Sequence, residues 1–281
     1  MSHVLTYDEI VHGLGDLPAL PAAVLELLRS VDGEDIDLAV LAQKVSHDPA
    51  LTAKTLRLAN SSLYGLQVKV TSVQQAITYL GFQTTRNLIK AVAITRCFIG
   101  TGCAGFNHEA FWRHSIASAI CAKALARHAR FHQDYAFTAG LLHDIGRLVL
   151  VSCFPRHYEA VLAWRSRHDS VLVEAERAVL AIDHIEAGLA LAEHWRFSDT
   201  MRLAIGGHHA PEQAGASFLA TIVHVADAIA HALDLAQMDE ELVPPLSEAA
   251  WNRLQLDDAA CHHLFQETER QYGEIAAVLL P

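Results

Sequence analysis

The pair His143-Asp144 lies inside a segment that is otherwise almost entirely apolar, residues 139–150. A segment this apolar belongs in the core of a folded chain. There, an imidazole and a carboxylate without partners cost several kcal/mol or change their pKa values. Gly140 and Gly146 flank the pair and allow neighbouring backbone to come close. The fold must therefore bring further polar side chains, or a metal ion, to this pair.

Helical periodicity dominates the 281 residues, and convincing runs of strand-like alternation are absent. The pattern predicts an all-α fold. Apolar spacing, capping residues, glycines and prolines place the helices. They are expected at Ala22–Val31, Leu38–His47, Pro49–Asn60, 71–80, Thr84–Phe98, Glu109–His128, Tyr135–Phe154, Tyr158–Arg167, Leu172–Ile182, His184–Trp195, Asp199–Gly206, Ala216–Leu235 and from Ser247 onward.

The clearest linker is Gly100–Gly105, where three of six residues are glycine. It predicts two helical lobes, residues 14–100 and 106–240. The pair Pro244-Pro245 marks a third unit, a C-terminal helical appendage over 241–281.

The formal net charge is −11, from 32 acidic and 21 basic residues. Nucleic acids and anionic membranes attract positively charged surfaces, so neither is expected as the main partner. The predicted helices Leu38–His47 and Ala50–Asn60 resemble a helix-turn-helix pair, but their Lys and Arg residues are only Lys44, Lys54 and Arg57. DNA binding is therefore disfavoured.

The cysteines, the N-terminus and the hydropathy pattern bear on the cellular compartment. The five cysteines show no CxxC spacing, and no basic segment followed by an apolar one opens the chain. No stretch approaches the roughly 18 uninterrupted apolar residues of a membrane span. We expect a cytoplasmic protein with reduced thiols and no membrane partner.

Further ionisable residues fall in phase with apolar helix faces and are candidate partners of the His-Asp pair. Together with it they form a set of five imidazoles and two carboxylates: His114, His143, Asp144, His184, His208, His209 and Asp227. Such donors suit first-row transition metals. If Asp144 bridges two ions, one ion would take His114, His143, Asp144 and Asp227. The other would take Asp144, His184, His208 and His209.

Taken singly, these residues have simpler interpretations. One histidine on an apolar face is usually a hydrogen-bonded core residue, His208-His209 could be an exposed loop pair, and Asp227 could cap a helix or pair with an arginine. Only the joint pattern favours a metal. The other histidines, His224 and His231 included, are assigned to the surface or to supporting the ligands, although these two lie one turn either side of Asp227.

Two groups of motifs resemble the HD superfamily, and more closely its HDOD branch (HD-related output domains). The first is Asp48–Gly65 followed by Val70–Ile77 and Leu80-Gly81. The second is Gly140–Gly146, then His184 with Gly188 and Trp195, then His208–Pro211. The resemblance covers roughly residues 14–235. It implies a two-lobed helical bundle with an HD-like core, an N-terminal HDOD lobe and a role in bacterial signal transduction.

Many HDOD proteins lack the metal ligands of the superfamily. This sequence keeps every position of the pattern in related two-metal phosphodiesterases, at the seven residues given above. The resemblance thus implies a divalent transition metal, with two ions. Iron or manganese is favoured, and zinc, nickel or magnesium remains an alternative.

Other positions depart from those phosphodiesterases. Arg147 replaces a lysine three residues after the aspartate, and Ala210–Ala214 replaces an acidic residue and a Gly-Tyr-Pro loop. Ala110 stands where three-metal variants have glutamate. We therefore expect a regulatory output module with a protein partner in signalling. The alternative is a metal-dependent phosphohydrolase or phosphodiesterase of a phosphorylated small molecule, in which Asp144 and Arg147 would be catalytic and Arg147 would steady the developing charge.

Overall fold

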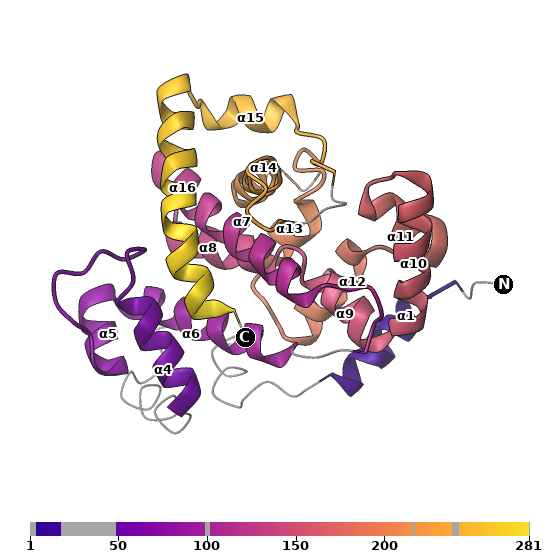
Figure 1. Ribbon diagram of the computed structural model, residues 1–281, viewed down its shortest axis with the longest axis horizontal. Helices are drawn as coiled ribbons and strands as arrows, with labels where there is room; N and C mark the ends of the chain where they lie inside the picture. The colour runs from indigo at the N-terminus through magenta and orange to yellow at the C-terminus, as the bar shows by residue number, and fades with distance from the viewer. Residues whose placement is uncertain are drawn as a thin grey trace.

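The computed structural model describes residues 4–17, 49–98, 102–213, 215, 217–237 and 242–280. Over these ranges the chain forms helices joined by turns, with no β-strand (Figure 1). The predicted all-α class is confirmed. The helices predicted at Ala22–Val31 and Leu38–His47 lie outside the described residues.

The helices follow one another in the order shown in Figure 1. They are α1 (Tyr7–Gly13), the 3₁₀ helix η1 (Leu14–Asp16), α4 (Pro49–Ala59), α5 (Val73–Leu80), α6 (Phe82–Cys97), α7 (His108–His128), α8 (Gln133–Leu142), α9 (Ile145–Cys153), α10 (Pro155–His168), α11 (Leu172–Leu180), α12 (His184–His194), α13 (Asp199–Gly207), α14 (Phe218–Ala232), α15 (Glu248–Leu254) and α16 (Asp258–Leu279). Helices α1 and η1 are absent from the sequence-based prediction. The other observed helices lie within predicted ones or exceed them by at most a few residues.

Local sequence explains most helix starts. A side-chain oxygen at the residue before the helix accepts from a backbone amide of the first turn, which satisfies a donor that has no intrahelical partner. This arrangement is present at Thr6, Ser72, Asn107, Asp183, Ser198, Ser217, Ser247 and Asp257. Between α5 and α6, Gly81 has φ +84°, a conformation that favours glycine.

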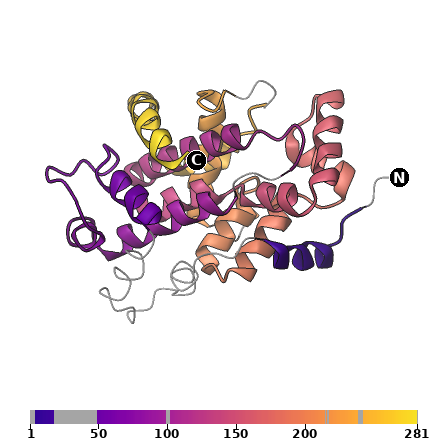
Figure 2. The ribbon, with the colours of Figure 1, turned by 60° about the horizontal axis from the view of Figure 1, so that its bottom comes forward.

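Helix α7 is the centre of the bundle. Along most of its length its side chains are buried, and it packs against α8, α14 and α16 (Figures 1 and 2). Such all-round burial explains why so many of its residues are alanine, because small side chains let several helices approach one axis.

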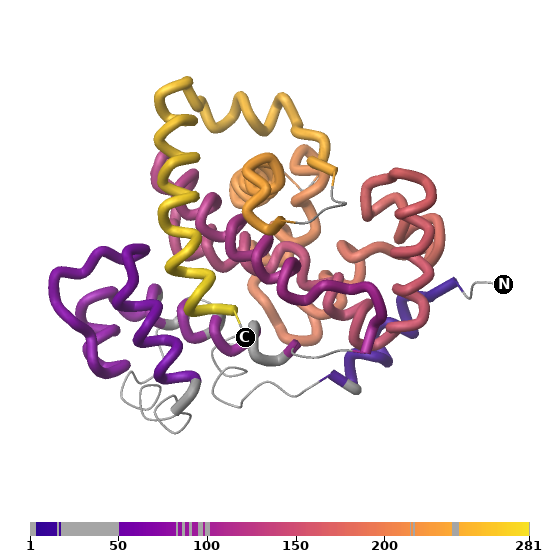
Figure 3. The backbone as a smooth tube through the Cα atoms, in the orientation of Figure 1, coloured from indigo at the N-terminus to yellow at the C-terminus, as the bar shows by residue number. Residues whose placement is uncertain are grey.

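The C-terminal helix α16 lies along α7 and also reaches α4, as the chain path in Figure 3 shows. Arg57 and Lys54 donate to the carbonyl oxygens of Ala277 (3.5 Å) and Leu280 (3.3 Å), and the backbone amide of Ser62 donates to Glu274. The last helix therefore contacts elements on both sides of the predicted linker. The division into lobes and appendage stays a prediction.

The sequence predicts one continuous helix over Tyr135–Phe154, and this prediction is wrong. Helix α8 ends at Leu142 and α9 begins at Ile145, so the His-Asp pair occupies the turn between them. Asp144 precedes α9 with φ −96° and ψ 13°, and its carboxylate makes no capping bond to that helix. The turn brings the two side chains close together, with Nε2 of His143 3.7 Å from Oδ1 of Asp144. In a continuous helix, successive side chains would diverge by about 100°.

Among the described residues, one stretch has the length and apolarity to cross a membrane, Gln133–Cys153. Its most apolar window is 89% buried inside the protein, because α8 and α9 are core helices. Core helices pass the same compositional test as membrane spans.

Candidate metal centre

The structure brings all seven predicted side chains together. His114 comes from α7 and His143-Asp144 from the turn between α8 and α9. The others come from the start of α12, the end of α13 and the middle of α14: His184, His208, His209 and Asp227. All are buried except His209, which is half-buried. Residues up to 113 positions apart in the sequence thus share one interior cluster.

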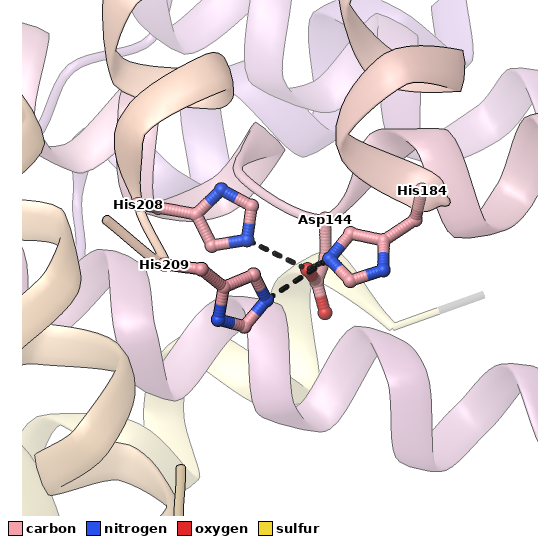
Figure 4. A group of neighbouring side chains, drawn as sticks. All are labelled: Asp144, His184, His208 and His209. Carbon is pink, nitrogen blue, oxygen red and sulfur yellow. Dashed lines mark hydrogen bonds and ion pairs between the residues drawn. The ribbon is translucent and has the colours of Figure 1, made fainter. Parts of the chain in front are cut away.

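Asp144 is the middle of the first group (Figure 4). Its Oδ1 atom lies 3.3 Å from Nε2 of His184 and 3.4 Å from Nε2 of His208. The Nε2 atoms of His184 and His209 are 3.1 Å apart. Ligand atoms bound about 2.1 Å from one ion lie roughly 3.0 Å apart at octahedral angles and 3.4 Å apart at tetrahedral ones. The group therefore has the spacing of a coordination shell.

Asp227 is the middle of the second group. Its Oδ1 atom lies 2.9 Å from Nε2 of His114 and 3.4 Å from Nε2 of His143, and those two nitrogens are 3.4 Å apart. His143 Nε2 also lies 3.7 Å from Asp144 Oδ1. Asp144 thus stands between both groups, as a bridging carboxylate would.

In three histidines, the ring nitrogen that points away from the cluster, Nδ1, is hydrogen-bonded to another group of the protein. Nδ1 of His143 hydrogen-bonds the carbonyl oxygen of Gly140 (2.7 Å), and Nδ1 of His208 that of Ile205 (2.7 Å). Nδ1 of His184 bonds Oε2 of Glu176 (2.5 Å). A proton on Nδ1 satisfies each of these acceptors, so Nε2 is the ring atom left to bind an ion in the interior.

Two buried polar atoms inside the cluster lack a hydrogen bond, Nε2 of His208 and Oδ1 of Asp227. Ion-pair contacts at 3.4 Å and 2.9 Å reach these atoms, but without hydrogen-bond geometry. Buried polar atoms are normally satisfied, so two unsatisfied atoms within one cluster indicate a missing partner. A divalent cation fits, since both atoms are electron-pair donors.

The protonation states suit a cation as well. Burial raises the pKa of Asp144, but His143, His184, His208 and Arg147 outweigh it and hold this pKa well below its usual range. Neighbouring histidines do the same for Asp227. Burial and the nearby His208 and His184 lower the pKa of His209 to about 2. Anionic carboxylates and neutral imidazoles are the forms that bind metal.

His143 and His184 behave differently. Burial lowers the pKa of His143, but the carboxylates of Asp144 and Asp227 outweigh burial and raise this pKa. Burial also lowers the pKa of His184, but the carboxylates of Glu176 and Asp144 outweigh burial and raise the pKa to about 9. Two carboxylates thus flank this imidazole, one at each ring nitrogen. In the absence of metal they attract a proton to the ring, and a metal ion would replace that proton.

Arg147 is buried beside the cluster. Its Nη1 atom donates to Oδ2 of Asp144 (3.0 Å), the oxygen on the far side from the histidines, and its guanidinium carbon lies 5.5 Å from the ring centre of Phe111. A pocket opens onto the cluster and includes Arg147. Its lining includes Asp144, His184, His209 and Asp227 as well as Arg165, Val171, Leu172, Leu242 and Pro244.

Three further residues border the cluster: His224 and His231, which the sequence assigns to the surface or to supporting the ligands, and Glu176, which it does not predict. His231 lies with Nδ1 3.2 Å from Asp227 Oδ1 and its ring 4.2 Å from that of His114; its place one turn after Asp227 was the available signal. His224 bonds the carbonyl oxygen of His208 through Nδ1 (2.7 Å) and accepts from the backbone amide of Ser247 (2.9 Å). For Glu176, on α11, the only signal in the sequence is its position among apolar residues.

Comparison with known proteins agrees with this architecture. The HDOD domain family matches residues 17–211. A Shewanella amazonensis SB2B protein described as a candidate phosphohydrolase is 28% identical, with a TM-score of 0.75 over 96% of this chain and 98% of that one. An HDOD domain protein from Geobacter sulfurreducens has the same fold, with 24% identity and a TM-score of 0.80 over 98% of both chains.

Of two further relatives, one superposes less well on this chain and the other is much longer than this chain. The MmoQ response regulator from Methylococcus capsulatus str. Bath is 28% identical, with a TM-score of 0.50 over 88% of this chain and 97% of that one. An uncharacterized protein of Treponema pallidum (strain Nichols) is 25% identical over 210 residues, 73% of this chain. The matched part spans only 40% of the length of that relative.

Proposed function

The chain belongs to the HDOD family, and on that premise we propose that it is a signal-transduction output module with a dinuclear metal site in its core. The observation that carries the metal site is the inward convergence of Nε2 atoms on Asp144 and Asp227, with two buried donor atoms left unsatisfied. Bound cations would balance the negative charge of these two buried carboxylates.

In this proposal two ions would share Asp144 as a ligand. His114, His143 and Asp227 would hold one ion, and His184, His208 and His209 would hold the other. Mixed imidazole and carboxylate donors suit iron or manganese, with zinc, nickel or magnesium as alternatives. The site would then report metal occupancy, or a small ligand bound in the adjoining pocket, to a protein partner in signalling. The likeness to a response regulator supports that role.

A metal-dependent phosphohydrolase is the second candidate, favoured by one observation. Arg147 lines the pocket beside the cluster, and Asp144 fixes its guanidinium group at 3.0 Å. Bound metal would supply Lewis acidity and an activated water. Arg147 would hold a phosphoryl oxygen by charge and hydrogen bonds, and Asp144 would keep its planar group in orientation. The Shewanella relative described as a candidate phosphohydrolase supports this alternative.

A substrate panel separates the two candidates. Metal-loaded protein is assayed against phosphomonoesters and cyclic nucleotides beside an Asp144→Ala control. An output module gives no turnover above that control. Turnover that the Asp144→Ala variant loses, and that Arg147→Ala reduces, contradicts the preferred proposal and supports the phosphohydrolase.

A further inference from the structure

Glu176 places a carboxylate in the interior of the protein. It lies on α11 and is 0% exposed, with Ala175, Val179 and Leu180 buried on the same helix. A carboxylate moved from water into such surroundings loses several kcal/mol of hydration unless hydrogen bonds and charge replace it. Its partners therefore indicate why the chain has a glutamate there.

Both oxygens of Glu176 have partners. Oε2 accepts from Nδ1 of His184 (2.5 Å) and from the backbone amide of His184 (2.9 Å), and Oε1 accepts from the hydroxyl of Tyr158 (3.0 Å). His184 is the first residue of α12, so its amide has no acceptor within the helix. One carboxylate thus fixes both the start of α12 and the imidazole ring.

The direction of the ring follows from this contact. With Nδ1–H donating to Glu176, the Nε2 lone pair faces Asp144 at 3.3 Å and His209 at 3.1 Å. His143 and His208 are held at Nδ1 by neutral carbonyl groups, whereas His184 is held by a carboxylate. An anionic acceptor makes the opposite nitrogen a stronger electron donor.

Tyr158 extends the contact toward the pocket. Its hydroxyl donates to Glu176. Burial and Glu176 raise the pKa of that hydroxyl, and the positive charge of Arg147, which donates to Asp144, acts against them and lowers it. Tyr158 thus lies between the carboxylate that holds His184 and the guanidinium group that holds Asp144.

We propose that Glu176 is a positioning residue of the metal site, which selects the tautomer of His184 and strengthens its Nε2 atom as a ligand, with Tyr158 orienting the carboxylate. The inference rests on the proposed metal-binding function. It adds to the seven ligands a residue from α11, an element that contributes none of them.

The test compares Glu176→Gln with wild type, using Mn²⁺ and Co²⁺ as probes. Glutamine keeps the size of the side chain and an acceptor oxygen but removes the charge. We expect about 10- to 100-fold weaker Mn²⁺ binding by equilibrium dialysis. The visible spectrum of the Co²⁺-loaded protein should also change, because the donor strength of His184 falls. Tyr158→Phe should weaken binding less.

Glu267→Gln is the matched control. Glu267 is also a buried glutamate, but on α16, where Arg127 and Gln271 are its partners. Its variant should bind Mn²⁺ within about twofold of wild type and keep the Co²⁺ spectrum, which separates positioning from general loss of a buried carboxylate. If Glu176→Gln does not fold, Tyr158→Phe decides by the same two measurements.

The outcomes are distinguishable. If the wild type binds metal and Glu176→Gln shows unchanged affinity and spectrum, this inference alone is overturned. The same holds for Tyr158→Phe where it is used in place of Glu176→Gln. The same loss in Glu267→Gln as in Glu176→Gln overturns it too. Wild type that binds neither ion contradicts the proposed function, and this inference with it.

Discussion

The hydrogen bonds that the histidines of the cluster make through Nδ1 determine which of their ring nitrogens can bind a metal ion. His143, His184 and His208 each bind the protein through Nδ1, so their Nε2 atoms cannot point elsewhere. The sequence predicts which ionisable residues gather in the core, because each lies in phase with the apolar face of its predicted helix. It does not predict that Glu176 supports His184, since that contact joins two helices whose relative angle no local pattern encodes.

At the residue scale, His114 and His231 provide a matched pair. Nε2 of His114 lies 2.9 Å from Oδ1 of Asp227. Nδ1 of His231 lies 3.2 Å from the same oxygen, but it also bonds the backbone carbonyl oxygen of Asp227 at 3.0 Å. His114→Ala should therefore weaken Mn²⁺ binding roughly tenfold or more, and His231→Ala should change it little. Equilibrium dialysis checks this. Equal losses in both variants mean that the ligand set includes His231.

At the element scale, two glycines bring four helices together at the site. A Cβ on Gly146 would lie 1.8 Å from the carbonyl oxygen of His184, and one on Gly140 would lie 2.8 Å from the Cα of Ala119. Helix α9 therefore meets α12, and α8 meets α7, at backbone contact. The sequence predicts close approach at both positions. The interruption between α8 and α9 is not predictable, because apolar residues continue through it on all sides.

Gly146→Ala tests the approach of α9 to α12. The added methyl group forces the helices apart, so we expect a loss of about 1–3 kcal/mol or more in the free energy of unfolding and a lower metal affinity. The control is Gly273→Ala in α16, where a Cβ meets nothing within 4 Å. Alanine there should stabilise the helix by up to about 1 kcal/mol. Urea unfolding measures both, and a Gly146→Ala variant as stable as wild type contradicts the packing argument.

At the scale of the whole molecule, α7 joins the parts of the chain. It carries His114 of the metal site, and its Lys123 contacts the segment after α4. Nζ of Lys123 donates to the carbonyl oxygen of Leu63 at 3.3 Å and lies 3.8 Å from the ring centre of Tyr64. The all-α class and the helix order were predictable from periodicity and capping residues. The packing of α16 across α7 and α4 was not, because its apolar face fits any neighbouring groove.

The Lys123 contact predicts a pH effect on stability. Burial lowers the pKa of Lys123 to about 8, against about 10.4 in an unfolded chain. Between these values the unfolded chain binds more protons than the folded one, so stability rises with pH across that window. Lys123→Met removes the group. We expect the variant to be more stable than wild type at pH 7.5, with the difference shrinking by pH 9.5 in urea unfolding. A constant difference contradicts the assignment.

The central claim is that the cluster around Asp144 holds metal, and metal content tests it most directly. Protein purified without chelator, or stripped and then reconstituted with Mn²⁺ or Fe²⁺ under reducing conditions, is analysed by elemental mass spectrometry beside Asp144→Ala. We predict that wild type approaches two ions per chain and that the variant retains none above background. A wild-type chain that refuses reconstitution, or an Asp144→Ala chain with unchanged metal content, contradicts the account.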